Sequence, residues 1–504
     1  MTAFTLSKNI KSKIVTVIAF LFLTLFLSSC DDMDKYGDVE CLKWVTYGSS
    51  VPLDVKEVLD AANRISAEKI GIVVDLEIQP SDKLNLMMAS GESYDMVFAS
   101  SWVNKFDERA ESGMFYDITD IVKEETPDLY EIPGDYWDCT RLGDRIYGIP
   151  MLKDMGSECM FRLNADYFEG EKGMKIPERM EFKDIEPFLE AYKKDYHYRY
   201  PLEMSSGGVP GSWSSTEGIV DNIIVVPYEV KRNEAKAIAF WEAEDIMEQY
   251  RLLHSWYKLG YIHPDAATID STTGDTTIPV RFGMAWKGYM GYCNKERWGF
   301  NVKTTIYDGP YLSRNTQQGS IIGISAGCSE ERVRDCLRYI ELLYTDKDFR
   351  DVLAYGIEGK HFRYLENGTV LRTQTGSDRY SLGLYQTGPA ISASVESPSE
   401  SVLSDPDQWV EVYKEYEEEG IYSPVNGFVY DPSEFTNTIS ALRAIFNDYI
   451  TGLRTGTSDP EEVVPKMKAR MEAAGINELI DDVNKQLEEW KEKGSDKGEE
   501  PVNE

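Results

Sequence analysis

The chain has 504 residues and carries a formal net charge of −34 at pH 7, from 53 basic and 87 acidic side chains. Such an acidic protein repels the phosphate backbone of nucleic acids, so we expect no nucleic-acid partner. The length exceeds what one hydrophobic core usually supports, which predicts at least two lobes.

The N-terminal segment predicts an exported lipoprotein. Three lysines precede an apolar stretch of 14 residues at 14–27, interrupted only by two threonines. A helix that crosses a bilayer needs roughly 20 apolar residues, so the stretch favours a cleaved signal over a membrane anchor. It ends in Leu-Ser-Ser-Cys, from which we predict a signal peptide at 1–29 and lipidation of Cys30.

A cysteine that carries two or three acyl chains holds a protein stably on a membrane. We therefore expect residues 30–41 to be a short tether. The rest of the chain should face the outside of a bacterial cell membrane, or the periplasm. Residues 491–504 are charged and lack apolar periodicity, which predicts a disordered tail.

Between these ends the chain alternates segments typical of strands and helices, which is the α/β pattern. The expected strands lie at 42–47, 72–78, 94–98, 146–150, 281–286 and 320–325. The expected helices lie at 55–68, 83–88, 182–193, 243–258, 329–344, 440–449 and 476–490. The last of these carries its apolar residues along one stripe, so we expect it to pack on the surface of a lobe.

Five segments, in this order along the chain, carry a resemblance to a known family. They are KLNLMMASGESYDMVF at 83–98, GMFYDITD at 113–120, RIYGIP at 145–150, GMAWKGY at 283–289 and LAYGIEGKHF at 353–362. Together they resemble the extracellular solute-binding proteins of bacterial ABC importers, of the family 1 type and the carbohydrate-associated lipoprotein branch. The resemblance spans residues 44–490.

The resemblance implies an α/β fold of the two-lobe, periplasmic-binding-protein-like type II, with discontinuous lobes around a hinge. We expect the first lobe at 42–149 and 303–352, and the second lobe at 150–302 and 353–490. A ligand that bridges both lobes would stabilise the closed form, and the importer permeases would recognise that form. We expect no cofactor, and we expect a monomer.

Carbohydrate sites combine flat aromatic faces with planar polar side chains. The candidate ligand-binding residues are aromatic residues beside glycines or at strand ends, and one amide. They are Tyr47, Trp102, Asn104, Trp213, Trp286 and Tyr289. The resemblance places Trp286 and Tyr289 on a loop that faces the cleft from the second lobe. The alternative for each aromatic residue is packing, and for Asn104 it is turn bonding.

The sequence contains no pattern typical of an enzyme or a metal site. Its four histidines show no metal-ligand spacing, and it has no Gly-x-Ser-x-Gly elbow, phosphate loop or dinucleotide fingerprint. The predicted function is reversible capture of a sugar or oligosaccharide for an ABC importer. The open alternatives are a surface glycan-degrading enzyme, a peptide binder and an adhesion protein without a small-ligand cleft.

Overall fold

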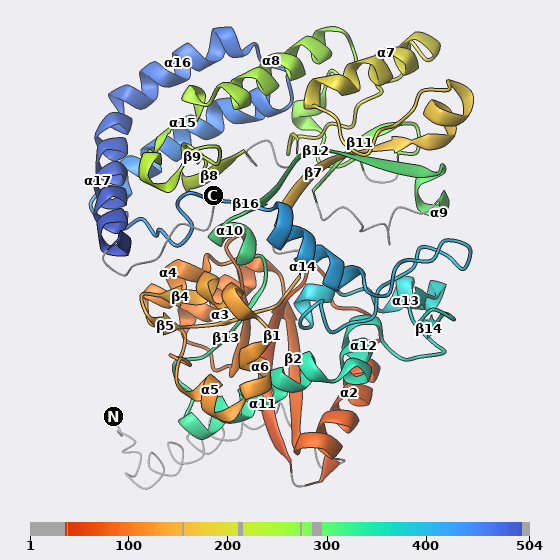
Figure 1. Cartoon of the computed structure of the whole chain (residues 1–504), viewed down its shortest axis with the longest axis vertical. Helices are drawn as coiled ribbons and strands as arrows, with labels where there is room; N and C mark the ends of the chain where they lie inside the picture. The colour runs from red at the N-terminus through yellow and green to blue at the C-terminus, as the bar shows by residue number, and fades with distance from the viewer. Residues whose placement is uncertain are drawn as a thin grey trace, which may run out of the picture.

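The computed structural model describes residues 36–37, 39–153, 156–209, 215–272, 275–284 and 295–495. Figure 1 shows two lobes, one above the other, with segments from distant parts of the chain in each. The cores agree with this division. One buried cluster joins residues from 42–152 to residues from 322–353, and another joins residues from 161–282 to residues from 425–487.

The lower lobe is built on a five-stranded sheet with the order β2-β1-β3-β13-β6. Its strands are β1 (Glu40–Tyr47), β2 (Ile72–Gln79), β3 (Met96–Ala99), β6 (Ile149–Pro150) and β13 (Ile321–Ile324). β1 pairs in parallel with β2 and β3, and β13 runs antiparallel to both β3 and β6. The first three strands and β6 therefore point the same way. Two short hairpins, β4–β5 (Arg141–Leu142 and Arg145–Ile146) and β14–β15 (Phe362–Tyr364 and Val370–Arg372), lie outside the sheet.

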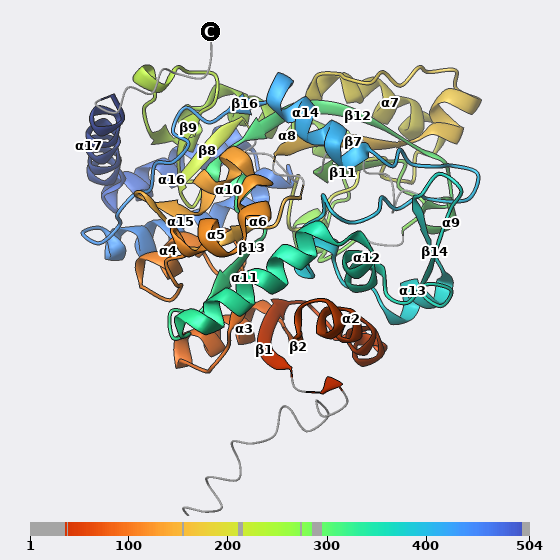
Figure 2. The same ribbon diagram turned by 60° about the horizontal axis from the view of Figure 1, so that its bottom comes forward.

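Helices cover the lower sheet, and three of them lie side by side in Figures 1 and 2 (α2, Val55–Ile70; α11, Glu330–Thr345; α12, Lys347–Tyr355). Shorter helices of this lobe include α3 (Ser81–Ser90), α4 (Phe106–Glu111), α5 (Ile121–Glu125), α6 (Pro127–Glu131) and α13 (Gln374–Arg379).

The helix α2 shows why these segments form where they do. It ends at Gly71, whose left-handed backbone (φ 70°) closes the last turn with a hydrogen bond to Ala67. Its buried Asn63 exchanges two hydrogen bonds with the backbone of Val74 in β2, so this polar side chain is satisfied inside the core.

The upper lobe contains a four-stranded sheet, β11-β7-β12-β16, and a three-stranded sheet, β10-β9-β8. These strands are β7 (Ser157–Asn164), β8 (Thr216–Val220), β9 (Ile224–Pro227), β10 (Ile238–Ala239), β11 (Val280–Met284), β12 (Val302–Leu312) and β16 (Ile421–Tyr422). Its helices are α7 (Glu186–Asp195), α8 (Glu244–Lys258), α9 (Lys295–Trp298), α15 (Thr436–Arg454), α16 (Pro460–Ala473) and α17 (Ile476–Ser495). As predicted, α17 packs on the lobe surface, beside α15 and α16 (Figure 1).

The lobe boundaries differ from two of those expected. Residues 303–312 belong to the upper lobe, because β12 pairs along its length with β7. The chain enters the lower lobe only after Leu312, at α10 (Arg314–Gln317). It also stays there well beyond residue 353, since α14 (Gln408–Glu419) packs through Tyr413 on Tyr136. It returns to the upper lobe at β16.

Smaller differences have local causes. The expected strand at 146–150 divides between two sheets around Gly148, where a side chain would lie 2.6 Å from Ile321. β1 begins at Glu40, inside the expected tether, because Glu40 and Cys41 pair with β2. The expected disordered tail is helical up to Ser495, since α17 continues to that residue.

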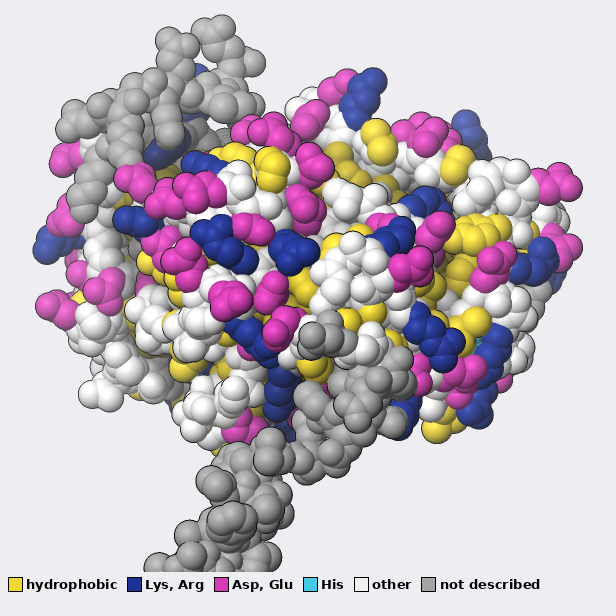
Figure 3. Space-filling view, turned by 90° about the horizontal axis from the view of Figure 1, so that it is seen from below, with side chains coloured by type: hydrophobic (Ala, Val, Ile, Leu, Met, Phe, Trp, Pro, Cys, Tyr) yellow, Lys and Arg dark blue, Asp and Glu magenta, His cyan; other side chains and the backbone are white. Residues whose placement is uncertain are grey.

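The lower lobe presents a mixed surface. Figure 3 views the molecule from below, and acidic and basic side chains alternate across this face, with apolar side chains in small groups between them. The negative net charge therefore does not form one continuous acidic field on this face. Within the described residues, no helix has the length and apolarity needed to cross a membrane.

Candidate functional site

The carboxyl ends of three strands of the lower sheet meet at one edge. β1 ends at Tyr47, β3 at Ala99 and β6 at Pro150, and these strands run in the same direction. In open α/β sheets, ligands bind beyond this edge, because loops from neighbouring strands converge there and leave a crevice. A ligand site is therefore expected in the segments that follow these three strands.

Four aromatic side chains gather at this edge, and we call them the aromatic platform: Tyr47, Phe98, Trp102 and Tyr385. The ring centroids of Tyr47 and Trp102 are 5.2 Å apart in an edge-to-face arrangement. Phe98 is buried between the others, with centroids 5.9 Å from Tyr47, 6.2 Å from Trp102 and 6.5 Å from Tyr385. Trp102 is 52% exposed, which is unusual for so large an apolar ring.

The loop that carries Trp102 is held by hydrogen bonds of its own. The Asn104 amide accepts from the backbone N–H of Ser100 and donates to the carbonyl oxygen of Phe98, each at 2.9 Å. Asn104 is only 2% exposed. The indole N–H of Trp102 donates to the carbonyl oxygen of Gly319 at 2.8 Å. Asn104 therefore positions the loop in this structure, while the Trp102 ring faces outward.

Tyr385 and Lys153 belong to this edge although they were not among the predicted ligand-binding residues. The Lys153 ammonium lies 4.3 Å from the centre of the Tyr385 ring, which is a cation–π contact. Lys153 follows β6, where the chain leaves the lower lobe. Nothing in the local sequence around Tyr385 distinguishes it from the other tyrosines, because its place on the platform depends on long-range contacts.

On the upper lobe, the strands β7 and β11 bring two arginines together. Arg162 and Arg281 are register partners, and a side chain at Gly283 would lie 2.5 Å from the Arg162 guanidinium. The glycine of the GMAWKGY segment is therefore required for the arginine to pack. β11 ends at Met284, which is 54% exposed. Trp213, Trp286, Tyr289 and Cys30 lie outside the described residues.

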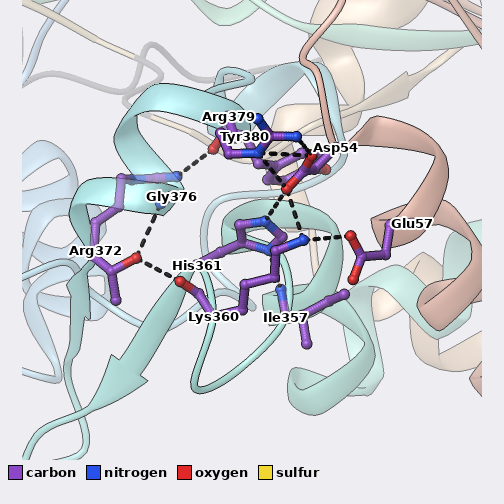
Figure 4. A network of polar contacts seen from close by, with 10 residues as sticks. Asp54, Glu57, Ile357, Lys360, His361, Arg372, Gly376, Arg379 and Tyr380 are labelled. Carbon is purple, nitrogen blue, oxygen red and sulfur yellow. Dashed lines mark hydrogen bonds and ion pairs between the residues drawn. The ribbon is translucent and has the colours of Figure 1, made fainter.

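The LAYGIEGKHF segment forms an ion cluster with the residue that precedes α2 (Figure 4). Asp54 accepts hydrogen bonds from Arg379, from the Lys360 ammonium at 2.8 Å and from His361 Nε2 at 3.1 Å. These three donors hold the pKa of the Asp54 carboxyl well below its usual range, with Arg379 contributing most. His361 Nδ1 accepts the Ile357 backbone N–H, so the proton lies on Nε2.

A buried carboxylate lies where the chain crosses between lobes. Glu217 on β8 accepts a 2.9 Å hydrogen bond from the Tyr228 hydroxyl. Ser313 and Ser423, which directly follow β12 and β16, also hydrogen-bond to it. Burial raises the pKa of Glu217 to about 6, against the lowering effect of these hydroxyl donors. Glu217 therefore links two of the crossing segments through one carboxylate.

The described residues also form two cavities that the aromatic platform does not line. A cavity of about 590 Å³ lies at the amino end of β3, around Asp95 and Cys328, where Arg332 forms a paired salt bridge with Asp95. Another of about 180 Å³ lies between Phe182, Tyr307 and the start of α8. No group of metal-binding side chains is found among the residues that the structure describes.

Comparison with known proteins gives a consistent result. A carbohydrate ABC transporter substrate-binding protein of Streptococcus pneumoniae is 24% identical over 90% of this chain and 91% of its own. Lipoprotein LipO of Bacillus subtilis is 20% identical over 86% of this chain and 89% of its own. A family model described as a domain of unknown function (DUF3502) matches residues 424–492.

Solved structures of solute-binding proteins share the fold of this chain. The crystal structure of the N-glycan transport solute binding protein NgtS from Streptococcus pneumoniae has a TM-score of 0.79 at 24% identity, covering 89% of this chain and 98% of that chain. The same protein in complex with Man5GlcNAc has a TM-score of 0.70 at 23% identity, covering 90% and 98%. The predicted fold class is confirmed. The chain is thus similar in sequence to a carbohydrate ABC transporter substrate-binding protein over 90% of its length, and it has the two-lobe fold of the solute-binding proteins.

Proposed function

We propose that this protein is a lipid-anchored, extracellular solute-binding protein that captures a sugar or oligosaccharide and delivers it unchanged to the permease of an ABC importer. The observation that carries this proposal is the aromatic platform. Tyr47 and Trp102 meet at the carboxyl ends of β1 and β3, with Trp102 half exposed. Exposed rings of this kind stack on the apolar C–H face of a pyranose.

The upper lobe would complete the site. The chain leaves β11 at the exposed Met284, two residues before Trp286. Trp286, Tyr289 and Trp213 are also proposed to contact the ligand, with Asn104 as the residue that positions the Trp102 loop. A ligand that touches both lobes binds the closed form more tightly than the open form, so it shifts the population toward closure. The permease then distinguishes loaded from empty protein.

The test is a thermal-shift screen of the purified protein, with analysis of the ligand afterwards. Man5GlcNAc is the first probe, because NgtS is solved in complex with it. At about 100-fold excess over its Kd, a ligand adds about 2.7 kcal/mol to the free energy of unfolding. We expect a raised melting temperature and an intact glycan. Released products would indicate an enzyme, a shift with peptides alone would indicate a peptide binder, and no shift with any small molecule would favour an adhesion protein.

The lipid anchor is tested separately. Cys30 follows a short apolar stretch, and an acylated cysteine there would keep the protein on the membrane after cleavage. We expect labelled palmitate to enter the wild-type protein and the Cys30→Ala variant to remain unlabelled. Equal labelling of the two proteins would place the lipid elsewhere, and no labelling of either would contradict the anchor.

A further inference from the structure

Tyr385 reaches the aromatic platform from a segment outside the sheet. It lies in the short 3₁₀ helix η8 (Leu384–Gln386), which is not one of the strands of the lower sheet. Yet its ring lies 6.5 Å from the buried Phe98 ring and 4.3 Å from the Lys153 ammonium. An irregular segment keeps a side chain in one place only if other groups hold its backbone.

Arg350 is the group that holds it. This α12 residue is completely buried, and its guanidinium spreads its donors over the backbone on both sides of Tyr385. The acceptors are the carbonyl oxygens of Leu384 (2.6 Å), Gly388 (3.1 Å) and Pro389 (2.6 Å) and the Thr387 hydroxyl (3.1 Å). A planar guanidinium has five N–H donors in fixed directions, so it can bind four acceptors at once, which an ammonium cannot match.

A buried cation is a costly way to fix a loop. Burial lowers the pKa of Arg350 to about 10, so the side chain is still charged at neutral pH. Taking a charge out of water is strongly unfavourable unless its hydrogen-bonding groups are well satisfied. The carbonyl and hydroxyl oxygens around Arg350 supply that compensation. One side chain therefore supplies four of the hydrogen bonds that hold this segment.

Two further hydrogen bonds place Tyr385 relative to the other rings. The Thr46 hydroxyl donates to the carbonyl oxygen of Gln386 at 2.6 Å, and Thr46 directly precedes Tyr47. The Ser320 hydroxyl donates to the carbonyl oxygen of Tyr385 itself at 2.8 Å, and Ser320 directly follows Gly319, the acceptor of the Trp102 indole. Thr46 is therefore the neighbour of a platform ring, and Ser320 is the neighbour of the residue that anchors another platform ring.

From this geometry we propose that Tyr385 is a third ligand-contacting ring of the platform and that Arg350 is its positioning residue. The proposal rests on the proposed function, because it concerns the same carbohydrate site. Arg350 itself does not touch the ligand. It acts only by fixing the backbone that carries Tyr385, so its effect on ligand affinity must disappear when the Tyr385 ring is removed.

The experiment is a double-mutant cycle on the full mature protein, with Man5GlcNAc as probe and Kd and melting temperature as the two readouts. Tyr385→Ala should weaken binding roughly tenfold with little change in melting temperature, and Tyr385→Phe should retain most of the affinity because it keeps the ring. Arg350→Met should lower both affinity and melting temperature. In the Tyr385→Ala background, Arg350→Met should still lower the melting temperature but leave Kd unchanged.

Two controls separate positioning from general destabilisation. Arg332→Met removes a guanidinium that binds Asp95 at the other end of β3, so it should lower the melting temperature without changing Kd. If Arg350→Met does not fold, Ser320→Ala removes one anchor of Tyr385 and should weaken binding by a few-fold, again only when the ring is present.

The outcomes also separate this inference from the proposed function. If the wild-type protein is stabilised by no carbohydrate in the screen, the proposed function fails and this inference fails with it. If the wild-type protein binds Man5GlcNAc or another oligosaccharide from the screen and Tyr385→Ala binds it equally well, only the inference is overturned. Additive losses in Kd for Arg350→Met and Tyr385→Ala would overturn the positioning role of Arg350.

Discussion

The indole N–H of Trp102 donates a 2.8 Å hydrogen bond to the carbonyl oxygen of Gly319, a residue 217 positions later in the chain. Ser320, the next residue, donates through its hydroxyl to the carbonyl oxygen of Tyr385. The two residues before β13 therefore anchor both the exposed Trp102 ring and the backbone that carries Tyr385. The candidate site depends on this convergence of segments that are far apart in sequence.

Removing the exposed ring should affect binding more than folding. In Trp102→Ala the protein loses a side chain that is 52% exposed, so the melting temperature should change little. The loss of a stacking face should weaken Man5GlcNAc binding roughly tenfold by calorimetry. Tyr198→Ala is the matched control, because Tyr198 is 65% exposed on the upper lobe, away from the platform. Equal affinities of Trp102→Ala and wild type would contradict a ligand role for this ring.

Asn104→Ala should lower the stability of the fold, unlike Trp102→Ala. The substitution leaves the buried Ser100 N–H and the Phe98 carbonyl oxygen without the amide that now binds them. The free energy of unfolding, measured in urea, should fall by about 1–3 kcal/mol. Ligand binding should weaken too, because Trp102 lies on the same loop. Asn477→Ala, at an exposed position of α17, should leave both quantities unchanged. Unaltered stability of Asn104→Ala would show that the loop does not need the amide.

The Asp54 cluster should contribute to stability at neutral pH and lose this contribution in acid. Arg379, Lys360 and His361 lower the pKa of the Asp54 carboxyl in the folded protein. The folded state therefore favours the ionised carboxylate more than the unfolded chain does. The contribution is complete above the usual aspartate pKa of about 4 and disappears as the pH falls below it. Asp54→Asn should lower the melting temperature at pH 7 and flatten its decline in acid.

Glu57→Gln is the control for this prediction. Glu57 pairs with the same Lys360 ammonium but is exposed, so its substitution should reproduce the wild-type melting curve at each pH. Parallel melting curves for Asp54→Asn and wild type down to about pH 3 would mean that the cluster does not stabilise the fold through this carboxylate.

Glu217 should produce a pH dependence of the reverse sign. Burial raises its pKa to about 6, so between the usual glutamate pKa of about 4.3 and this value the folded protein keeps a proton that the unfolded chain has released. Its contribution to stability therefore falls as the pH rises through this window and is constant above it, a change of about 2 kcal/mol.

The measurement is the difference in unfolding free energy between Glu217→Gln and wild type, from urea curves between about pH 4 and pH 7. This difference should grow in favour of the variant as the pH rises. Glu229→Gln, at an exposed position shortly after β9, should show no such trend. A difference that stays constant over the whole range would contradict the raised pKa.

The sequence by itself determined most of the regular elements. The alternation of segments typical of strands and helices predicted β1, α2, β2 and α11 to within about two residues of their observed bounds, and it predicted where α17 begins. These patterns are local, because a strand or helix needs one apolar face and a terminating residue within a short window. The same local reading identified Tyr47 and Trp102 as ring-bearing strand ends.

Only the tertiary structure decided how these elements combine. β12 joined the upper lobe through pairing with β7, so the expected boundary at 303 was wrong. Tyr385 joined the platform through Arg350, Thr46 and Ser320, which are distant in sequence from it or from one another. Long-range strand pairing and buried polar contacts form when remote segments pack together. The periodicity of one segment does not specify which remote segment it packs against.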